Sequence, residues 1–208
     1  MNASPSTEEL PLFPLQAVLF PDGLLGLKVF EARYLDLIGR CLREGKPFGV
    51  VGLKRGQEVR LPGHPAEVEL EEVGTRAELI DVDSPQPGIL SVRCRGGIRF
   101  RVVSSRQQED GLWVAQTTPI ARDAVVSPPP ELAGAVRGLA DAITALRGTG
   151  PLPFLAPHRF DDASWVANRW CEILPIPLAA RQRLLELGDP LTRLQIVDEY
   201  LRSKGLVT

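Results

Sequence analysis

The sequence predicts an α+β protein, in which a small β-barrel or curled antiparallel sheet is followed by a C-terminal helical bundle. Three observations lead to this fold class. In the first part, short runs of alternating apolar and polar residues lie between turn signals, which is typical of antiparallel strands. In the second part, apolar residues recur at three- and four-residue steps, which is typical of helices. The proline run Ser127–Pro130 lies where the pattern changes and suits a linker. We therefore predict two domains, 8–122 and 130–208.

The first domain opens with prolines, which push the residues before them toward extended conformations. Asp22–Gly23 is typical of a turn, and the alternation from Leu25 to Val29 predicts a strand. From Phe30 onward the period becomes that of a helix, which Gly45 is placed to end. The N-terminal part should therefore run as strand, turn, strand and helix.

Two later glycine signals divide the remaining strands of this domain. Gly96–Gly97 interrupts a long alternating stretch, so we expect a tight turn or a bulge there. Asp110–Gly111 predicts a hairpin before a last apolar strand. Many short strands with one early helix favour a curled sheet or a barrel.

The second domain should contain four helices. Asp162 and Asp189 are placed to cap two of them, and Pro190 follows in a first turn. Short connections between the helices favour a small antiparallel bundle. The apolar face of the first helix comprises Leu132, Val136, Leu139, Ile143 and Leu146.

The composition argues against several classes of protein. A formal net charge of -2 over 208 residues gives no global attraction to nucleic acid or anionic membrane. Three isolated cysteines argue against a disulfide framework and fit a reducing cytosol. No run approaches the ~20 apolar residues of a membrane span, and the N-terminus lacks the positive charge of a signal peptide. We therefore expect a soluble, cytoplasmic protein that does not contact membranes.

Six short motifs follow one another along the first domain. They are Leu10–Leu15, Leu19–Pro21, Phe30–Leu35, Phe48–Val50, Val73–Thr75 and Arg99–Phe100. Together they resemble the N-terminal, substrate-binding domain of the Lon protease family, and the resemblance spans most of the chain. It implies a PUA-like β domain followed by a helical region. Asp22 and Gly26 depart from the family pattern, which usually has glycine and proline at these positions.

Intact members of that family carry an ATPase module and a Ser-Lys peptidase module, and neither pattern occurs here. The stretch Gly39–Pro47 resembles a phosphate loop, but it has one residue too many and closes a helix instead of opening one. Glu67, Glu69 and Glu71 alternate along a strand, which indicates a solvated face rather than paired catalytic carboxylates. We therefore expect a stand-alone, non-catalytic module with no catalytic residues.

Metal or cofactor binding is not expected either. His64 and His158 lie far apart and have no ligand spacing, which is typical of ordinary loop histidines.

The family resemblance implies that the chain recognises polypeptide segments or a protein partner, in proteolysis or as an adaptor. A module that binds unfolded chains must expose apolar surface. Aromatic residues near the N-terminus are the candidate contacts, although most aromatic side chains of a domain belong to its core. The candidates are Phe13, Phe20, Phe30 and Tyr34.

The alternative is an RNA-binding protein that uses an arginine face. PUA-like folds include RNA-binding members, and arginine pairs well with phosphate. No aromatic residue interleaves these arginines, and nearby glutamates can pair with them across strands, so nucleic acid is the less favoured partner. An enzyme of unrecognised type is the third hypothesis. The four arginines predicted to share one face are Arg93, Arg95, Arg99 and Arg101.

Overall fold

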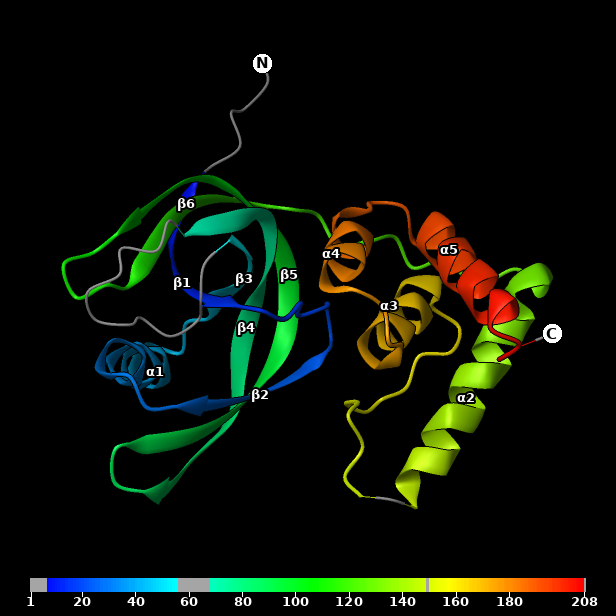
Figure 1. Cartoon of the computed structure of the whole chain (residues 1–208), viewed down its shortest axis with the longest axis horizontal. Helices are drawn as coiled ribbons and strands as arrows, with labels where there is room; N and C mark the ends of the chain where they lie inside the picture. The colour runs from blue at the N-terminus through cyan, green and yellow to red at the C-terminus, as the bar shows by residue number, and fades with distance from the viewer. Residues whose placement is uncertain (1–6, 56–67, 149, 208) are drawn as a thin grey trace. The chain divides into compact units, whose positions relative to one another are not determined.

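The computed structural model describes residues 7–55, 68–148 and 150–207 (Figure 1). The chain divides into two compact units, with the boundary between Ala121 and Arg122. We call the part up to Ala121 the β unit and the part from Arg122 the helical unit. His64 and Glu67, which entered two of the predictions, lie outside the described residues.

The β unit contains six strands and one α-helix among its described residues. They are β1 (Glu8–Leu15), β2 (Leu24–Val29), α1 (Ala32–Glu44), β3 (Phe48–Arg55), β4 (Glu69–Gln86), β5 (Ile89–Gln107) and β6 (Trp113–Pro119). The strands form one sheet in the order β2-β5-β4-β3-β1-β6. Because β6 also pairs with the C-terminal half of β5, the sheet curls back on itself (Figure 1).

The predicted curled sheet is confirmed, with one difference in strand direction. β1 and β3 pair in parallel, whereas the other five pairings are antiparallel. Parallel neighbours need a long connection between them, and here the chain passes through β2 and α1 before it reaches β3. The sequence pattern of each strand does not contain this information, because alternation is the same in both pairing modes.

Gly96–Gly97 forms a bulge, because β5 continues through it without a turn. Thr75 of β4 lies opposite Arg99, but Ala77 lies opposite Gly96, so β5 holds an extra residue between these two pairs. Glycine is required at position 96 by a close approach: a Cβ there would lie 2.0 Å from the carbonyl oxygen of Phe20. The bulge therefore makes room for the backbone that leads into β2.

Helix α1 packs its predicted apolar face into the core of the β unit. Gly45 ends the helix in the left-handed conformation, at φ 64°, and its N–H donates to the carbonyl of Cys41 at 2.9 Å. The helix contributes Tyr34, Leu37, Ile38 and Cys41 to a cluster with side chains from the strands.

The helical unit contains the four predicted helices, with a short 3₁₀ turn before the first of them. They are η1 (Pro130–Leu132), α2 (Ala133–Arg147), α3 (Ala163–Ile173), α4 (Leu178–Glu186) and α5 (Pro190–Ser203). Both predicted aspartate caps are confirmed. Asp162 accepts hydrogen bonds from the N–H groups of Ser164 and Trp165, and Asp189 accepts one from Thr192. Helix α3 packs mainly against α5.

The extended segment before η1 is bound to the helical unit. The carbonyl of Val126 accepts a hydrogen bond from the N–H of Ala163 at 2.8 Å. The carboxylate of Asp123 pairs with the guanidinium of Arg193 at 2.7 Å, and both side chains are buried. The stretch that precedes the proline run is therefore an ordered part of the helical unit. None of the described helices is long and apolar enough to cross a bilayer.

Candidate functional site

A shallow apolar hollow of about 300 Å³ lies along β2 in the β unit. The backbone and side chains of Leu25–Glu31 form one wall. Phe13, Leu15, Ala17 and Tyr34, from the end of β1 and the start of α1, form the rest. This volume is at the lower end of the range for small-ligand sites. The hollow can accept one or two apolar side chains of a binding partner.

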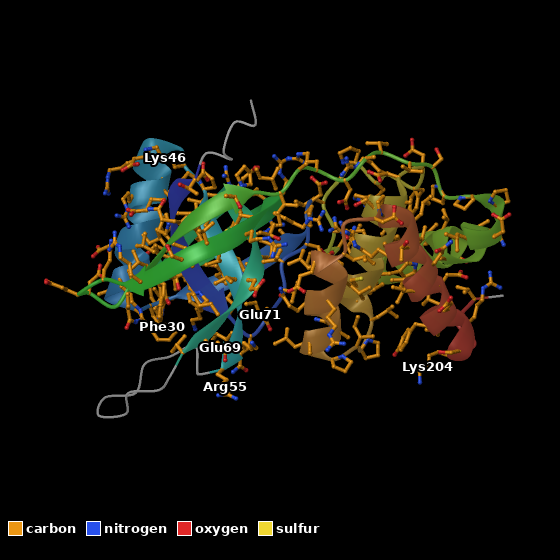
Figure 2. The ribbon with its side chains drawn as sticks, turned by 90° about the horizontal axis from the view of Figure 1, so that it is seen from above. Phe30, Lys46, Arg55, Glu69, Glu71 and Lys204 are labelled. Carbon is orange, nitrogen blue, oxygen red and sulfur yellow. The ribbon has the colours of Figure 1, made fainter. Side chains whose placement is uncertain are left out.

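Three of the four predicted aromatic contacts line this hollow. Phe13 and Tyr34 stack at its base, with ring centroids 3.9 Å apart and an interplanar angle of 15°. Both rings are mostly buried, so they support the hollow more than they project into it. Phe30 is different, because 53 % of its surface is exposed (Figure 2).

Phe20, the fourth predicted contact, is fully buried and does not line the hollow. The backbone carbonyl of Phe20 lies against Gly96 of the bulge. Sequence reasoning missed the lining residues Leu15, Leu25 and Leu27. The strand alternation around Val29 had indicated an apolar face, but it gave no sign that the face is only partly covered.

The exposed position of Phe30 follows from its place between two elements. Val29 ends β2 with its side chain buried, and Phe30 follows it outside the strand, before α1 begins at Ala32. The neighbouring Glu31 and Arg33 form an ion pair at 2.7 Å, and the Arg33 guanidinium also lies over the Tyr34 ring. The first turn of α1 is thereby fixed, and Phe30 is held beside the hollow.

The structure does not place the four predicted arginines on one solvent face. Arg93, Arg95 and Arg101 are exposed, but Arg99 is buried, with 4 % of its surface accessible. The bulge at Gly96–Gly97 adds a residue to β5 between Arg95 and Arg99, so Arg93 and Arg95 lie on one face of the strand and Arg99 and Arg101 on the other.

Carboxylates of β4 also neutralise part of this arginine set. Arg95 pairs with Glu78 at 2.7 Å, and Arg101 pairs with Glu72 at 3.3 Å. Such cross-strand pairs had been expected from the sequence. Of the acidic strand face, Glu69 pairs with Lys54 at 2.6 Å, and this hydrogen bond lowers the pKa of the Glu69 carboxyl.

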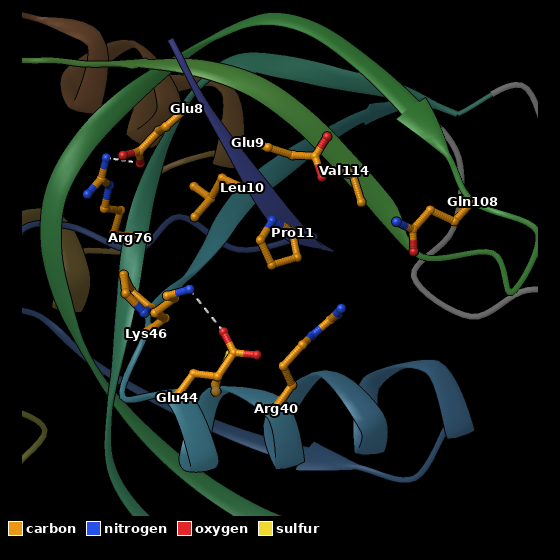
Figure 3. Close-up of a pocket in the computed structure, with 12 residues that line it drawn as sticks. Glu8, Glu9, Leu10, Pro11, Arg40, Glu44, Lys46, Arg76, Gln108 and Val114 are labelled. Atoms are coloured by element: carbon orange, nitrogen blue, oxygen red, sulfur yellow. Dashed lines mark hydrogen bonds and ion pairs between the residues drawn. The ribbon is translucent and has the colours of Figure 1, made fainter. Parts of the chain in front are cut away.

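A second pocket, of about 420 Å³, lies between the start of β1 and the C-terminal end of α1 (Figure 3). Three acidic and three basic side chains line it, so neither charge dominates. They are Glu8, Glu9, Glu44, Arg40, Lys46 and Arg76.

Each carboxylate of this charged pocket has a cationic partner. Glu8 pairs with Arg76, Glu44 pairs with Lys46 at 3.1 Å, and Glu9 pairs with Arg106 at 3.0 Å. The arrangement is that of a surface ion-pair network rather than of a general acid and base.

The three cysteines, Cys41, Cys94 and Cys171, are free and buried. Burial raises the pKa of Cys41 above its ordinary value, and burial raises the pKa of Cys94 and of Cys171 to about 12. A thiol that stays protonated at neutral pH is neither a good nucleophile nor a good metal ligand. Within the described residues, no group of three or more histidine, cysteine or acidic side chains is arranged to hold a metal ion.

The comparisons with known proteins all point to the same family. Residues 9–203 match the model of the ATP-dependent protease La (LON) substrate-binding domain. Lon proteases of Xanthomonas oryzae pv. oryzae and Desulfovibrio desulfuricans are both 25 % identical, over 94 % and 98 % of this chain. The chain spans 23 % of the length of each of these two relatives.

Solved structures show the same fold. A Lon N-terminal domain protein from Xanthomonas campestris is 34 % identical and aligns with a TM-score of 0.70, over 91 % of this chain and 96 % of its own. The N-terminal domain of Lon protease from Mycobacterium avium complex is 14 % identical, with a TM-score of 0.63 over 93 % of this chain and 97 % of its own. The PUA-like α+β fold expected from the sequence is thereby confirmed. The chain belongs to the family of the LON substrate-binding domain.

Proposed function

We propose that this chain is a non-catalytic module that recognises polypeptides by binding exposed apolar segments in the hollow along β2. The observation that carries the proposal is the position of Phe30. A large aromatic side chain, half exposed, adjoins an apolar hollow that is lined by two further aromatic rings. Apolar surface that is contiguous and exposed is typical of interaction sites.

The energetic contribution of this contact is modest. Covering the exposed half of Phe30 contributes roughly 1 kcal/mol, which is about a fivefold gain in affinity. A module of this kind therefore needs contacts beyond one ring, and the remaining walls of the hollow supply them. Weak binding of many different segments suits a protein that selects unfolded chains.

The family description supports substrate binding as the role of the module. An adaptor role is an extension of the same proposal, in which the bound polypeptide is passed to a separate protease. The cytoplasm remains the expected compartment, since three free, buried cysteines suit a reducing environment.

RNA binding is the weaker alternative, because no feature of the described residues favours it. Of the four predicted arginines, one is buried and two are paired with glutamates. Arg93 is exposed but lies opposite Asp81 in the strand register. Phosphate binding at these positions would have to displace carboxylates that already neutralise the arginines.

The test is fluorescence anisotropy with labelled casein as an unfolded polypeptide and with a short labelled RNA. We expect casein binding that depends weakly on salt, and we expect Phe30→Ser to weaken it by about fivefold. Val103→Ser is the matched control, because Val103 is similarly exposed, at 58 %, but does not line the hollow. Binding of RNA alone, with a steep salt dependence that is lost in Arg93→Ala, would overturn the proposal.

A further inference from the structure

Among the residues that the structure describes, one edge of β2 has no strand partner. Within the described part of the chain β2 pairs with β5 alone, and the register continues without a bulge over Leu24–Val29. An edge strand presents unpaired backbone donors and acceptors at alternate residues, which makes it a template for a further strand. The hollow lies along this same strand.

The alternation of the ladder shows which residues direct their backbone groups to the free edge. Both backbone groups of Gly96 face the chain that leads into β2: its N–H donates to the carbonyl of Gly23 at 2.9 Å, and its carbonyl accepts from the N–H of Asp22 at 2.7 Å. Gly96 therefore occupies a hydrogen-bonded position of the ladder. Hydrogen-bonded and non-hydrogen-bonded pairs alternate along an antiparallel ladder. Leu24, Gly26 and Lys28 therefore occupy non-hydrogen-bonded pairs, and their N–H and C=O groups point away from β5.

The side chains of β2 show what an added strand would meet. Leu25, Leu27 and Val29 face the core of the β unit, and all three line the hollow. Every second side chain of an added strand would lie on this face, because side chains alternate with a period of two. On the other face, Lys28 is exposed and has no ion-pair partner among the described residues. An acidic side chain of the added strand would complement that charge.

We propose that β2 binds an extended polypeptide segment as an additional strand of the sheet. The segment places alternate apolar side chains in the hollow and an acidic side chain beside Lys28. This inference rests on the proposed function and names its substrate class: extended segments with alternating apolar residues, rather than helices or uninterrupted apolar runs. Backbone hydrogen bonds supply sequence-tolerant affinity, and the hollow supplies the preference for apolar side chains.

Gly26 allows the backbone contact to be tested separately from the hollow. Proline at this position removes an N–H that points to the free edge, and it leaves the hydrogen bonds between β2 and β5 in place. The φ angle of Gly26 is not in the left-handed region, and a Cβ there meets nothing within 4 Å. Gly26→Ala is therefore a control that adds a side chain but keeps the N–H.

The probe is a short labelled peptide in which valine alternates with threonine and one glutamate. Two further peptides serve as controls: one of the same composition with its valines contiguous, and one with alternate backbone amides N-methylated. We expect Gly26→Pro to weaken binding of the alternating peptide by about five- to tenfold, the loss of one hydrogen bond. Gly26→Ala keeps the N–H and should therefore weaken binding clearly less than Gly26→Pro does. N-methylation should weaken binding to the wild type at least as much, which provides a readout independent of how Gly26→Pro folds.

The outcomes separate this inference from the proposed function. If Phe30→Ser weakens binding but Gly26→Pro and N-methylation do not, the hollow binds polypeptide without strand addition and the inference is wrong. If the wild type binds neither casein nor the alternating peptide, the proposed function itself fails. If light scattering shows a dimer that Gly26→Pro dissociates, the occupant of the edge is a second copy of this chain, which also overturns the inference.

Discussion

Most arginines of the β unit lie at the surface, whereas two arginines of the helical unit are almost completely buried. Arg95 and Arg101 extend from β5 into solvent and meet glutamates of the neighbouring strand. Arg169 and Arg193 are 0 % and 1 % exposed, inside the helical unit. Arg95 and Arg101 thus belong to the surface of the β unit, whereas Arg169 and Arg193 belong to the core of the helical unit.

The buried Arg193 joins three parts of the helical unit. Its guanidinium pairs with Asp123 of the extended segment and donates to Asn168 of α3 at 3.2 Å. It also donates to the carbonyl groups of Leu184, at 2.8 Å, and Leu187 at the end of α4. The last carbonyls of a helix have no partner within it, and this one arginine satisfies two of them.

This difference in arginine burial suggests how the strands of one unit and the helices of the other are held in a single arrangement. The backbone ladder holds the curled sheet together, so its surface ion pairs are accessory. The helical unit has short helices and irregular connections, and we infer that the pairing of the buried Arg193 favours one arrangement of them. We therefore expect the exposed arginine pairs of the β unit to contribute less to stability than the buried Arg193 of the helical unit.

The largest effect should come from removing that buried charge. We expect Arg193→Met to lower the free energy of unfolding by about 3–5 kcal/mol, because the buried carboxylate of Asp123 would lose the guanidinium that neutralises it. Urea denaturation followed by tryptophan fluorescence measures this change, since Trp165 and Trp170 lie in the same unit. A loss no larger than that of the surface variant Arg95→Met would contradict the comparison.

The next effect concerns the bulge that organises the β unit. Gly96→Ala should destabilise the protein by about 1–3 kcal/mol, because its Cβ would overlap the carbonyl of Phe20. Thermal unfolding by circular dichroism measures the shift, with Gly26→Ala as a control in open space. If both alanine variants melt at the wild-type temperature, the close approach at the bulge does not exist in solution.

Alkaline pH should destabilise both units through their buried thiols. Burial in the folded state raises the pKa of Cys94 and of Cys171 from 9.0 to about 12. Between these two pH values the thiols lose their protons in the unfolded state but keep them in the folded state. Stability is full below pH 9 and falls as pH rises, by up to about 1.4 kcal/mol per pH unit for each thiol.

Comparing alanine variants isolates this contribution from that of other groups. Denaturation between pH 8 and pH 11 should show a shallower loss of stability in Cys94→Ala, and also in Cys171→Ala, than in the wild type. Rapid reaction of the native thiols with a disulfide reagent at neutral pH would show that they are not buried as described.

The smallest effect should come from the surface pairs of the β unit. A double-mutant cycle of Arg95→Ala and Glu78→Ala should give a coupling of about 0.2–1 kcal/mol, because both side chains are substantially exposed. The coupling should decrease as salt is added. A coupling of several kcal/mol would mean that the two units do not differ in how they use charge.

Local signals in the sequence were sufficient for much of the fold. The periodicity that begins after Phe30, the left-handed end at Gly45 and the caps at Asp162 and Asp189 were all predictable. Each depends on residues within one or two turns of the chain, so the sequence itself determines it. The departure from the family pattern at Asp22 was visible too, and in the structure this residue takes a positive φ of 59°.

Only the tertiary structure decided the features that involve distant strands and helices. Three features depend on segments far apart in the sequence: the parallel pairing of β1 with β3, the burial of Arg99 and the network around Arg193. The exposure of Phe30 and the burial of Phe20 were equally undetermined, since both are aromatic residues beside a turn. Local periodicity tells which residues share a face, but the neighbouring strand or helix decides whether that face is covered.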